Sequence, residues 1–576
     1  ALASLARLRF ARFAIDWSKS SDDPEALRKV GLERALSGLP VAGQVAEPGL
    51  KAELVGRLAR TAIELGGADD ARLAEAIATL QREAREPIGE AVAAELAARL
   101  ALKRGDKASA ARLLQGAILQ ESGRPVPLRL PEYFLLLAQA EPQQRLRHVS
   151  AAYAALENIR PRLPRLDPLT EESTFSLYMR RVFEAAADAQ LAAASSGDDD
   201  GHIRSAQQIV EAFRQAELQS AVGSECLPVR NAVDATSLVQ GETLLYPLLF
   251  ADRVEIITVS GASGDRRFRR LPANFTTNRQ EVAGLVEAFV VSLTRGEDDS
   301  WKAPARKLYD IFIAPVEAQL GPGSSLAIVP DGPLRSVPFA ALLAPDGKFL
   351  VERTAISVAP ALAYSQPGAG HARNRVSILA ASLQKRVIVS GLTFAALSGT
   401  ATEAQIAASN GSPGRLVRDF TRDELVTALA AEPFDVLHLA THASFNGRSD
   451  RAFIVANGGA IRLSELRDLI GRNRARGDEL GLLVLSACET AIGDDEASMG
   501  LAGAAVQAGA LSAIASLWQV DDAGTAELMR GFYGNYRAGQ SRAEALRQAQ
   551  LALIRHGGNN ADPYVWAAFT LLGAWR

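Results

Sequence analysis

The sequence of 576 residues contains only two cysteines, Cys226 and Cys488, which stand far apart and in unlike contexts. One pair placed in this way provides neither a disulfide framework nor a cysteine-rich zinc site. We therefore expect a reducing compartment, and provisionally the cytoplasm. The chain starts at Ala1 rather than at Met, so a removed leader or a missing native N-terminus stays open.

Long apolar runs are also missing. Arg, Glu or Gln interrupts every leucine-rich stretch before it reaches the roughly 18 to 20 residues that a helix needs to cross a bilayer. The opening segment, ALASLARLRFARFAIDW, interleaves arginine with apolar residues, whereas the core of a signal peptide carries no charge. We expect an amphipathic helix there, and no membrane span.

The chain carries little excess charge of either sign. Its formal net charge of -3 gives no field that would hold a phosphate backbone, so we expect no direct contact with nucleic acid. Hydrophobic residues make up 48% and charged residues 22% of the chain, which is typical of globular proteins. The length predicts several domains.

Residues 1–224 are rich in Ala, Leu, Arg and Glu, and their apolar residues recur at three- and four-residue spacings. We expect helices joined by short loops. The stretch 90–120 has Gly105 at a turn and small residues, Ala110 and Ala117, where two helices of a hairpin would touch. This pattern is similar to one tetratricopeptide unit, but its neighbours repeat it poorly, so tetratricopeptide-like hairpins and an irregular helical bundle both stay open.

The composition changes near residue 225. Beyond it, β-branched apolar runs predict buried strands, and helical patterns separate most of them. The runs are VEIITV at 254, LAIVP at 326, AISVAP at 355, VSILA at 376, DVLHLA at 435, LLVLSA at 482 and LSAIASLW at 511. This alternation predicts an α/β layered domain with a mostly parallel sheet, in which functional groups collect at the carboxyl ends of the strands.

Two of these predicted strands end in reactive side chains. His442 follows DVLHLA, and Cys488 follows LLVLSA. A free thiol has a pKa of about 8.5, so it needs a nearby imidazole to act as a nucleophile at neutral pH. The 46 positions between the two residues leave room for a crossover that returns a parallel strand to the same sheet.

Residue chemistry alone leaves simpler interpretations open. Free cysteine often fills a buried apolar site, and Cys488 could do the same. His438 and His442 would need further ligands to bind a metal, and the sequence provides none nearby, so we expect a structural His438 and no metal site. Cys226 has no neighbouring histidine, and we expect it to have no catalytic role.

The strings VLHLATHASF, LVLSACETAIG, AIASLWQVDD and DPYVWAAFTLLG follow one another in this order. Together with GETLLYPLLFADRVEIITV, LAIVPDGPLRSVPFAALL and LSGTATEAQI upstream, they resemble the CHAT family of caspase-like cysteine peptidases, clan CD relatives of caspases and separase. The resemblance covers about residues 225–576. It implies a non-catalytic half over residues 225–415 and a catalytic half over residues 416–576. Family members often carry tetratricopeptide-like helices ahead of the peptidase.

The resemblance implies a catalytic pair of His442 and Cys488, with no cofactor. It also implies that the backbone N–H groups of Cys488 and Ala443 hold the oxyanion. Family members usually have glycine at the positions of Ala443 and Ala491, so the geometry of this loop is a question for the structure. In related separases an acidic residue after the Leu-Trp strand end receives an arginine side chain.

Asp521, Asp522 and Glu489 are the candidates for such a contact, and they predict a basic P1 residue in the substrate. Asp521 and Asp522 would equally suit the N-terminus of the following helix, where the helix dipole favours a carboxylate.

Three hypotheses follow for the whole chain. The first is a bacterial-type cysteine endopeptidase that cuts protein substrates and is regulated by a partner protein on its N-terminal helices. The second is an inactive pseudopeptidase that serves as a scaffold. The third, a metal-dependent hydrolase that uses His438 and His442, lacks clustered carboxylate ligands.

Overall fold

The computed structural model describes residues 1–18, 21, 23–83, 87–194, 201–222, 238–261, 266–271, 276–296, 298–365, 375–389, 391–444, 453–462, 465, 466, 468, 470, 480–486, 509–520 and 522–576. The chain divides into two compact units, Ala1–Ala193 and Ala194–Arg576. Cys226, Cys488, Glu489, Ala491 and Asp521 lie outside the described residues.

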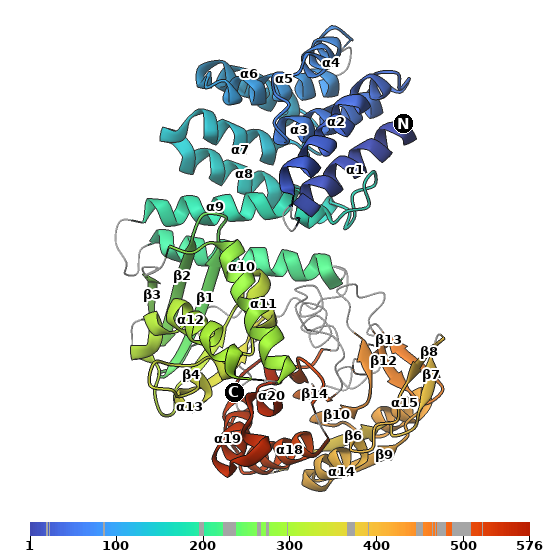
Figure 1. The fold of residues 1–576 in the computed structure, drawn as a ribbon, viewed down its shortest axis with the longest axis vertical. Helices are drawn as coiled ribbons and strands as arrows, with labels where there is room; N and C mark the ends of the chain where they lie inside the picture. The colour runs from blue at the N-terminus through green and yellow to red at the C-terminus, as the bar shows by residue number, and fades with distance from the viewer. Residues whose placement is uncertain are drawn as a thin grey trace. The chain divides into compact units, whose positions relative to one another are not determined.

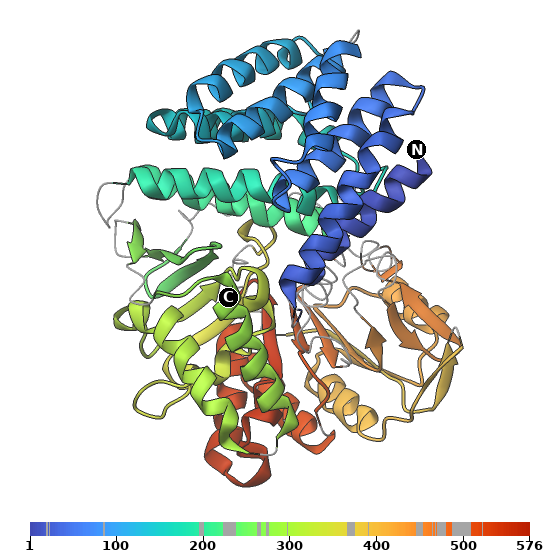
Figure 2. The same cartoon turned by 45° about the horizontal axis from the view of Figure 1, so that its top comes forward.

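The first unit is helical throughout its regular elements, as expected. Its helices are α1 (Leu2–Ser18), α2 (Pro24–Gly43), α3 (Pro48–Glu64), α4 (Ala71–Glu83), α5 (Pro87–Lys103), α6 (Lys107–Ser122), α7 (Leu130–Ala140), α8 (Arg145–Ile159) and α9 (Arg180–Ala193). Figure 2 shows these helices, in blue to teal, running side by side. No helix of the described ranges is long and apolar enough to span a membrane.

The hairpin expected at residues 90–120 is confirmed as α5 and α6. Gly105 lies between the two helices with φ of 80°, a conformation that side chains with a Cβ rarely adopt. Ala110 and Ala117 of α6 are almost fully buried in one cluster with Ala91 and Ala98 of α5. Small side chains therefore let the two helices approach closely.

Buried ion pairs also hold the first unit together. Arg57 of α3 donates two hydrogen bonds of 2.7 Å to the carboxylate of Asp167, in the loop between α8 and α9. Glu95 of α5, 1% exposed, pairs with Arg60 and Arg99 at 2.9 and 2.8 Å. Bidentate arginine–carboxylate contacts of this kind fix orientation as well as distance.

The second unit contains an 11-stranded mixed sheet in the order β3-β2-β1-β4-β5-β16-β15-β14-β10-β6-β9. In Figure 1 the strands β14, β10, β6 and β9 follow one another in this order. The strands of the sheet are β1 (Glu242–Leu249), β2 (Val254–Gly261), β3 (Arg266–Leu271), β4 (Ser325–Ile328), β5 (Ala355–Val358), β6 (Ile378–Ser382), β9 (Gly414–Arg418), β10 (Val436–Ala440), β14 (Leu482–Ser486), β15 (Ser512–Ser516) and β16 (Phe569–Gly573).

Most neighbouring strands of this sheet are parallel, so the α/β layered class is confirmed. Two smaller sheets contain β7 (Val387–Val389) with β8 (Leu392–Phe394), and β11 (Ala443–Ser444) with β12 (Phe453–Ala456) and β13 (Gly459–Arg462). The helices are α10 (Gly201–Val222), α11 (Arg279–Arg295), α12 (Lys302–Phe312), α13 (Leu350–Arg353), α14 (Thr400–Asn410), α15 (Arg422–Ala431), α18 (Asp522–Arg537), α19 (Arg542–His556) and α20 (Pro563–Trp566). Helix α18 packs against both α14 and α19, and these two helices pack against strands of the sheet.

Helix α10 belongs to the second unit, although its sequence pattern groups it with the helices of residues 1–224. Its Arg214 is 1% exposed and forms ion pairs with Glu217 on the same helix and with Asp331 after β4. Asp331 also accepts a hydrogen bond of 2.9 Å from the N–H of Leu249 in β1. An amphipathic pattern predicts a helix but not the core on which it packs, so sequence alone misses this contact.

Candidate active site

The strands β10 and β14 are parallel neighbours, and Ala440 at the end of β10 lies opposite Ser486 at the end of β14. Both strands are apolar and almost completely buried, as their sequences predict. His442 and Cys488 each follow two residues after these register partners. The chain therefore leaves both strands at one edge of the sheet. Of the two residues, His442 belongs to the described part of the chain and Cys488 does not.

A backbone carbonyl orients the imidazole of His442. The Nε2 atom lies 2.9 Å from the carbonyl oxygen of Ala395, and the ring of Phe394 packs beside the imidazole with centroids 5.4 Å apart. A carbonyl oxygen only accepts hydrogen bonds, so Nε2 carries a hydrogen. In the neutral ring this leaves Nδ1 with the lone pair, ready to act as a base.

Strand β12 fixes the backbone on either side of His442. The N–H of Val455 donates to the carbonyl of His442 at 2.8 Å, and the hydroxyl of Thr441 donates to the carbonyl of Val455 at 2.6 Å. Ala443 opens strand β11 and is the register partner of Ile454. Among the described residues other than glycine, only Glu171 and Asp419 have positive φ, so Ala443 adopts a backbone conformation that its Cβ tolerates.

His438, four residues before His442, is fully buried within strand β10. Its Nδ1 atom lies 2.8 Å from the hydroxyl of Tyr533, and its Nε2 atom lies 3.1 Å from a carboxylate oxygen of Glu403. Burial raises the pKa of Tyr533 well above its ordinary value, so the hydroxyl stays protonated. Nowhere in the described part of the chain do three or more His, Cys, Asp or Glu side chains gather as a metal site would require.

A small cavity of about 60 Å³ adjoins the imidazole. Ser486 and Ala443 belong to its wall, and the cavity is also lined by two acidic residues, Glu403 and Asp522. A site with two carboxylates favours a cation over an anion. The sequence signal for Asp522 was its place after the Leu-Trp strand end, whereas Glu403 was not singled out, although it lies in the string LSGTATEAQI.

Asp522 is the first residue of α18, in agreement with the helix-terminus alternative. Its Oδ2 atom accepts hydrogen bonds from the hydroxyl of Ser398 at 2.9 Å and from the N–H of Gly399 at 2.7 Å. The structure thus brings Asp522 and His442 to one cavity. Asp521 and Glu489 lie outside the described residues, so their place at this cavity stays a prediction.

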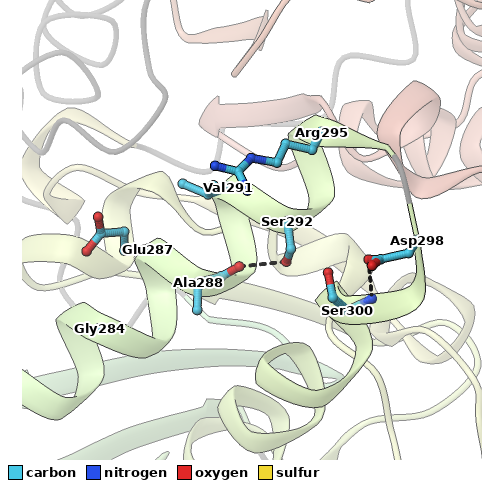
Figure 3. Close-up of a pocket in the computed structure, with 8 residues that line it drawn as sticks. All are labelled: Gly284, Glu287, Ala288, Val291, Ser292, Arg295, Asp298 and Ser300. Carbon is cyan, nitrogen blue, oxygen red and sulfur yellow. Dashed lines mark hydrogen bonds between the residues drawn. The ribbon is translucent and has the colours of Figure 1, made fainter.

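A larger cavity of about 430 Å³ lies along the outer face of α11 (Figure 3). The hydroxyl of Ser292 donates to the carbonyl of Ala288 at 2.6 Å, and the N–H of Ser300 donates to the carboxylate of Asp298 at 2.8 Å. None of its eight lining residues is a histidine or a cysteine. We therefore look for catalysis at His442 rather than here.

Residues 302–574 match the family model described as the CHAT domain. Two solved structures of the Saccharomyces cerevisiae separase–securin complex are similar at 9% and 10% identity, with TM-scores of 0.39 and 0.37, and each alignment covers 99% of this chain and 53% of that chain. The chain therefore spans about half the length of the separase chains. A complex of Porphyromonas gingivalis RgpB pro- and mature domains is similar at 9% identity with a TM-score of 0.30, covering 51% of this chain and 76% of that chain. The comparison with curated proteins gave no match.

Proposed function

This chain carries a caspase-like CHAT domain over residues 302–574, and we propose that it is a cysteine endopeptidase whose catalytic pair is His442 and Cys488. The observation that carries the proposal is the orientation of His442. Its Nε2–H is bound to the carbonyl of Ala395, which leaves Nδ1 as the base. Cys488 follows the parallel neighbouring strand at the same offset from the register pair Ala440 and Ser486. Neighbouring strands lie about 4.8 Å apart, which suits a short contact between the two side chains.

The first chemical step forms the acyl-enzyme. Nδ1 of His442 takes the proton from the thiol of Cys488, and the thiolate attacks the carbonyl carbon of the scissile peptide bond. The resulting tetrahedral intermediate collapses, the C–N bond breaks, and Nδ1–H of the imidazolium gives its proton to the leaving amine. The Ala395 carbonyl stabilises the imidazolium between these two transfers because it accepts the hydrogen on Nε2.

Water completes the reaction. Nδ1 of His442 takes a proton from a water molecule, which attacks the thioester, and the carboxylic acid leaves as the thiolate of Cys488 is regenerated. The negative oxygen of each tetrahedral intermediate would be held by the N–H groups of Cys488 and Ala443. Ala443 supports this role because it lines the cavity beside His442.

We propose a basic P1 residue for the substrate. The carboxylate of Glu403 at the cavity favours a positive side chain, and Asp521, Asp522 and Glu489 are the candidates for a direct contact with it. We expect these substrates to be proteins, because the CHAT domain is caspase-like. The helices of residues 1–193 would serve as the docking surface of a regulatory protein.

Internally quenched peptides that differ only in the P1 residue test this function. We expect the chain to cleave peptides with Arg or Lys at P1 in preference to Ala, and Cys488→Ala to abolish cleavage. Cys226→Ala is the matched control, since it removes the other thiol of the chain, and it should cleave like the wild type. Turnover that survives in Cys488→Ala would remove this dyad, whereas a wild type without turnover would leave the scaffold hypothesis.

A further inference from the structure

The loop of residues 395–399 joins strand β8 to helix α14 and provides the carbonyl that orients His442. Ala395 and Ser398 are exposed, so packing contributes little to the position of this loop. An exposed loop keeps one conformation only where specific hydrogen bonds hold it. The orientation of His442 thus depends on what fixes residues 395–399.

On one side, the N–H of Leu397 donates to the carbonyl of Gln384 at 3.1 Å, and the carbonyl of Leu397 accepts from the hydroxyl of Thr400 at 2.9 Å. On the other side, Asp522 accepts hydrogen bonds from both Ser398 and Gly399 through the same oxygen, Oδ2. We call this contact of three residues the Asp522 latch. It joins the start of α18 to the start of α14, three residues along the chain from Ala395.

Gly399 shows how closely the latch is packed. Its φ is -81°, which any residue adopts, so conformational freedom does not explain the glycine. A Cβ built at this position would instead lie 2.2 Å from the Cβ of Asp522 and 2.3 Å from its Cγ. A side chain at residue 399 would therefore push α18 and the loop apart.

We infer that Asp522 is a positioning residue, which holds the Ala395 carbonyl against His442 through Ser398 and Gly399, and that it is not the residue that selects P1. A guanidinium binds a carboxylate best with two parallel N–H donors, one to each oxygen. Two donors already occupy Oδ2, so bidentate binding of a P1 arginine at Asp522 would have to break the latch. The catalytic consequence of this inference rests on the proposed peptidase function.

The direct readout is the imidazole of His442, because it needs no substrate. The chain contains six histidines, so selective ¹⁵N labelling of histidine gives few ring signals. The signals that are missing in His442→Gln are those of His442. We expect Asp522→Ala and Gly399→Ala to shift the ring nitrogens of His442 and to increase exchange of its Nε2–H. Ser398→Ala removes one hydrogen bond and should give a smaller shift of the same kind.

Glu527→Gln is the matched control, because Glu527 lies on the same helix and its carboxylate accepts from Asn560 rather than from the loop. Its His442 signals should equal those of the wild type. Unchanged His442 signals in Asp522→Ala and Gly399→Ala, with folding verified by circular dichroism, would overturn the latch. If Asp522→Ala does not fold, Ser398→Ala, at an exposed position, replaces it, and unchanged His442 signals in that variant would overturn the latch.

Peptide cleavage separates positioning from P1 selection. We expect Asp522→Ala and Gly399→Ala to lower kcat about 10- to 100-fold for peptides with Arg and with Ala at P1 alike, so that the preference between them changes less than about threefold. A selective loss of the Arg peptide in Asp522→Ala, with the Ala peptide unaffected, would show instead that Asp522 binds P1. A wild type that cleaves neither peptide, with the latch intact by NMR, would contradict the proposed function and leave the structural contact standing.

Discussion

The guanidinium of Arg214 in α10 lies 2.9 Å from the carboxylate of Asp331, and both side chains are almost fully buried. Burial alone would raise the pKa of Asp331, but Arg214 lowers it below the ordinary value. The carbon of the guanidinium also lies 4.6 Å from the ring centroid of Phe213. A helix that precedes the sheet in sequence is thus held to the sheet by a charge pair that water hardly reaches.

Arg214→Met should destabilise the second unit by about 3 to 5 kcal/mol, because it leaves Asp331 charged, buried and unpaired. Arg214→Met combined with Asp331→Asn should recover part of this loss. Unfolding in urea followed by tryptophan fluorescence is the suitable measurement, since four of the five tryptophans lie in this unit. Equal losses in the single and the double variant would contradict the role of the ion pair.

Glu211 on the same helix has a raised pKa, so we expect it to lower the stability of the fold as the pH rises. Burial raises its pKa to about 7, against opposing hydrogen bonds from Tyr246 and from the N–H of Leu362. The folded state therefore binds a proton that the unfolded chain releases between about pH 4.5 and 7, and stability falls as the pH rises through this range.

Glu211→Gln should remove that loss. We expect it to raise the free energy of unfolding at pH 8 by about 1 to 3 kcal/mol, and to change it little at pH 4.5. Glu287→Gln on the exposed face of α11 is the control and should change stability by less than about 0.5 kcal/mol at either pH. The same gain at both pH values would show that charge is not the cause.

In the first unit the sign is reversed. Burial would raise the pKa of Asp167, but the hydrogen bonds from Arg57 and from the N–H of Thr170 lower it to about 2. The stability that this carboxylate contributes is therefore present above about pH 4 and is lost as the pH falls toward 2. Asp167→Ala should cost about 2 to 4 kcal/mol at pH 7 and much less at pH 2.

Circular dichroism at 222 nm during urea unfolding measures this cost. Asp69→Ala is the matched control in the same unit, because Asp69 is 93% exposed and lies 3.9 Å from Arg104. An equal cost for both variants would mean that burial of the Arg57–Asp167 pair does not matter.

The seven strands predicted from apolar runs are all present, from β2 to β15. Central strands of parallel sheets are apolar on both faces, so composition finds most of them, although β1 and β16 were not among the seven. The edge strands β3, with the sequence RRFRRL, and β9, with GRLVR, lacked that signal. Charged edges limit pairing with other chains, and the same charges hide these strands from a search for apolar runs.

At the candidate site, the sequence indicated His442, because a histidine directly after an apolar strand can be recognised from the sequence alone. It did not lead to Ala395, since that residue acts through its backbone carbonyl and any side chain could stand there. The sequence also did not distinguish the two interpretations of Asp522, because an acidic residue suits both the first turn of a helix and a contact with a basic P1 side chain. The bonds to Ser398 and Gly399 depend on the packing of α18 beside α14.

The resemblance to the CHAT family implies glycine at the position of Ala443, but the described backbone of Ala443 does not require glycine. It lies in β11 and its φ is not positive, so glycine has no conformational advantage there. We expect Ala443→Gly to change kcat/KM for an Arg peptide by less than about threefold. A gain above about tenfold would show that the alanine restrains the oxyanion site after all.

In the proposed mechanism His442 makes Cys488 a nucleophile. Labelling with an acyloxymethyl ketone that carries arginine at P1, followed by peptide mapping in a mass spectrometer, measures the reactivity of this thiol. We expect one adduct, at Cys488 and not at Cys226, formed at least about 100-fold more slowly in His442→Gln. Equal labelling of both cysteines, or an unchanged rate in His442→Gln, would contradict it.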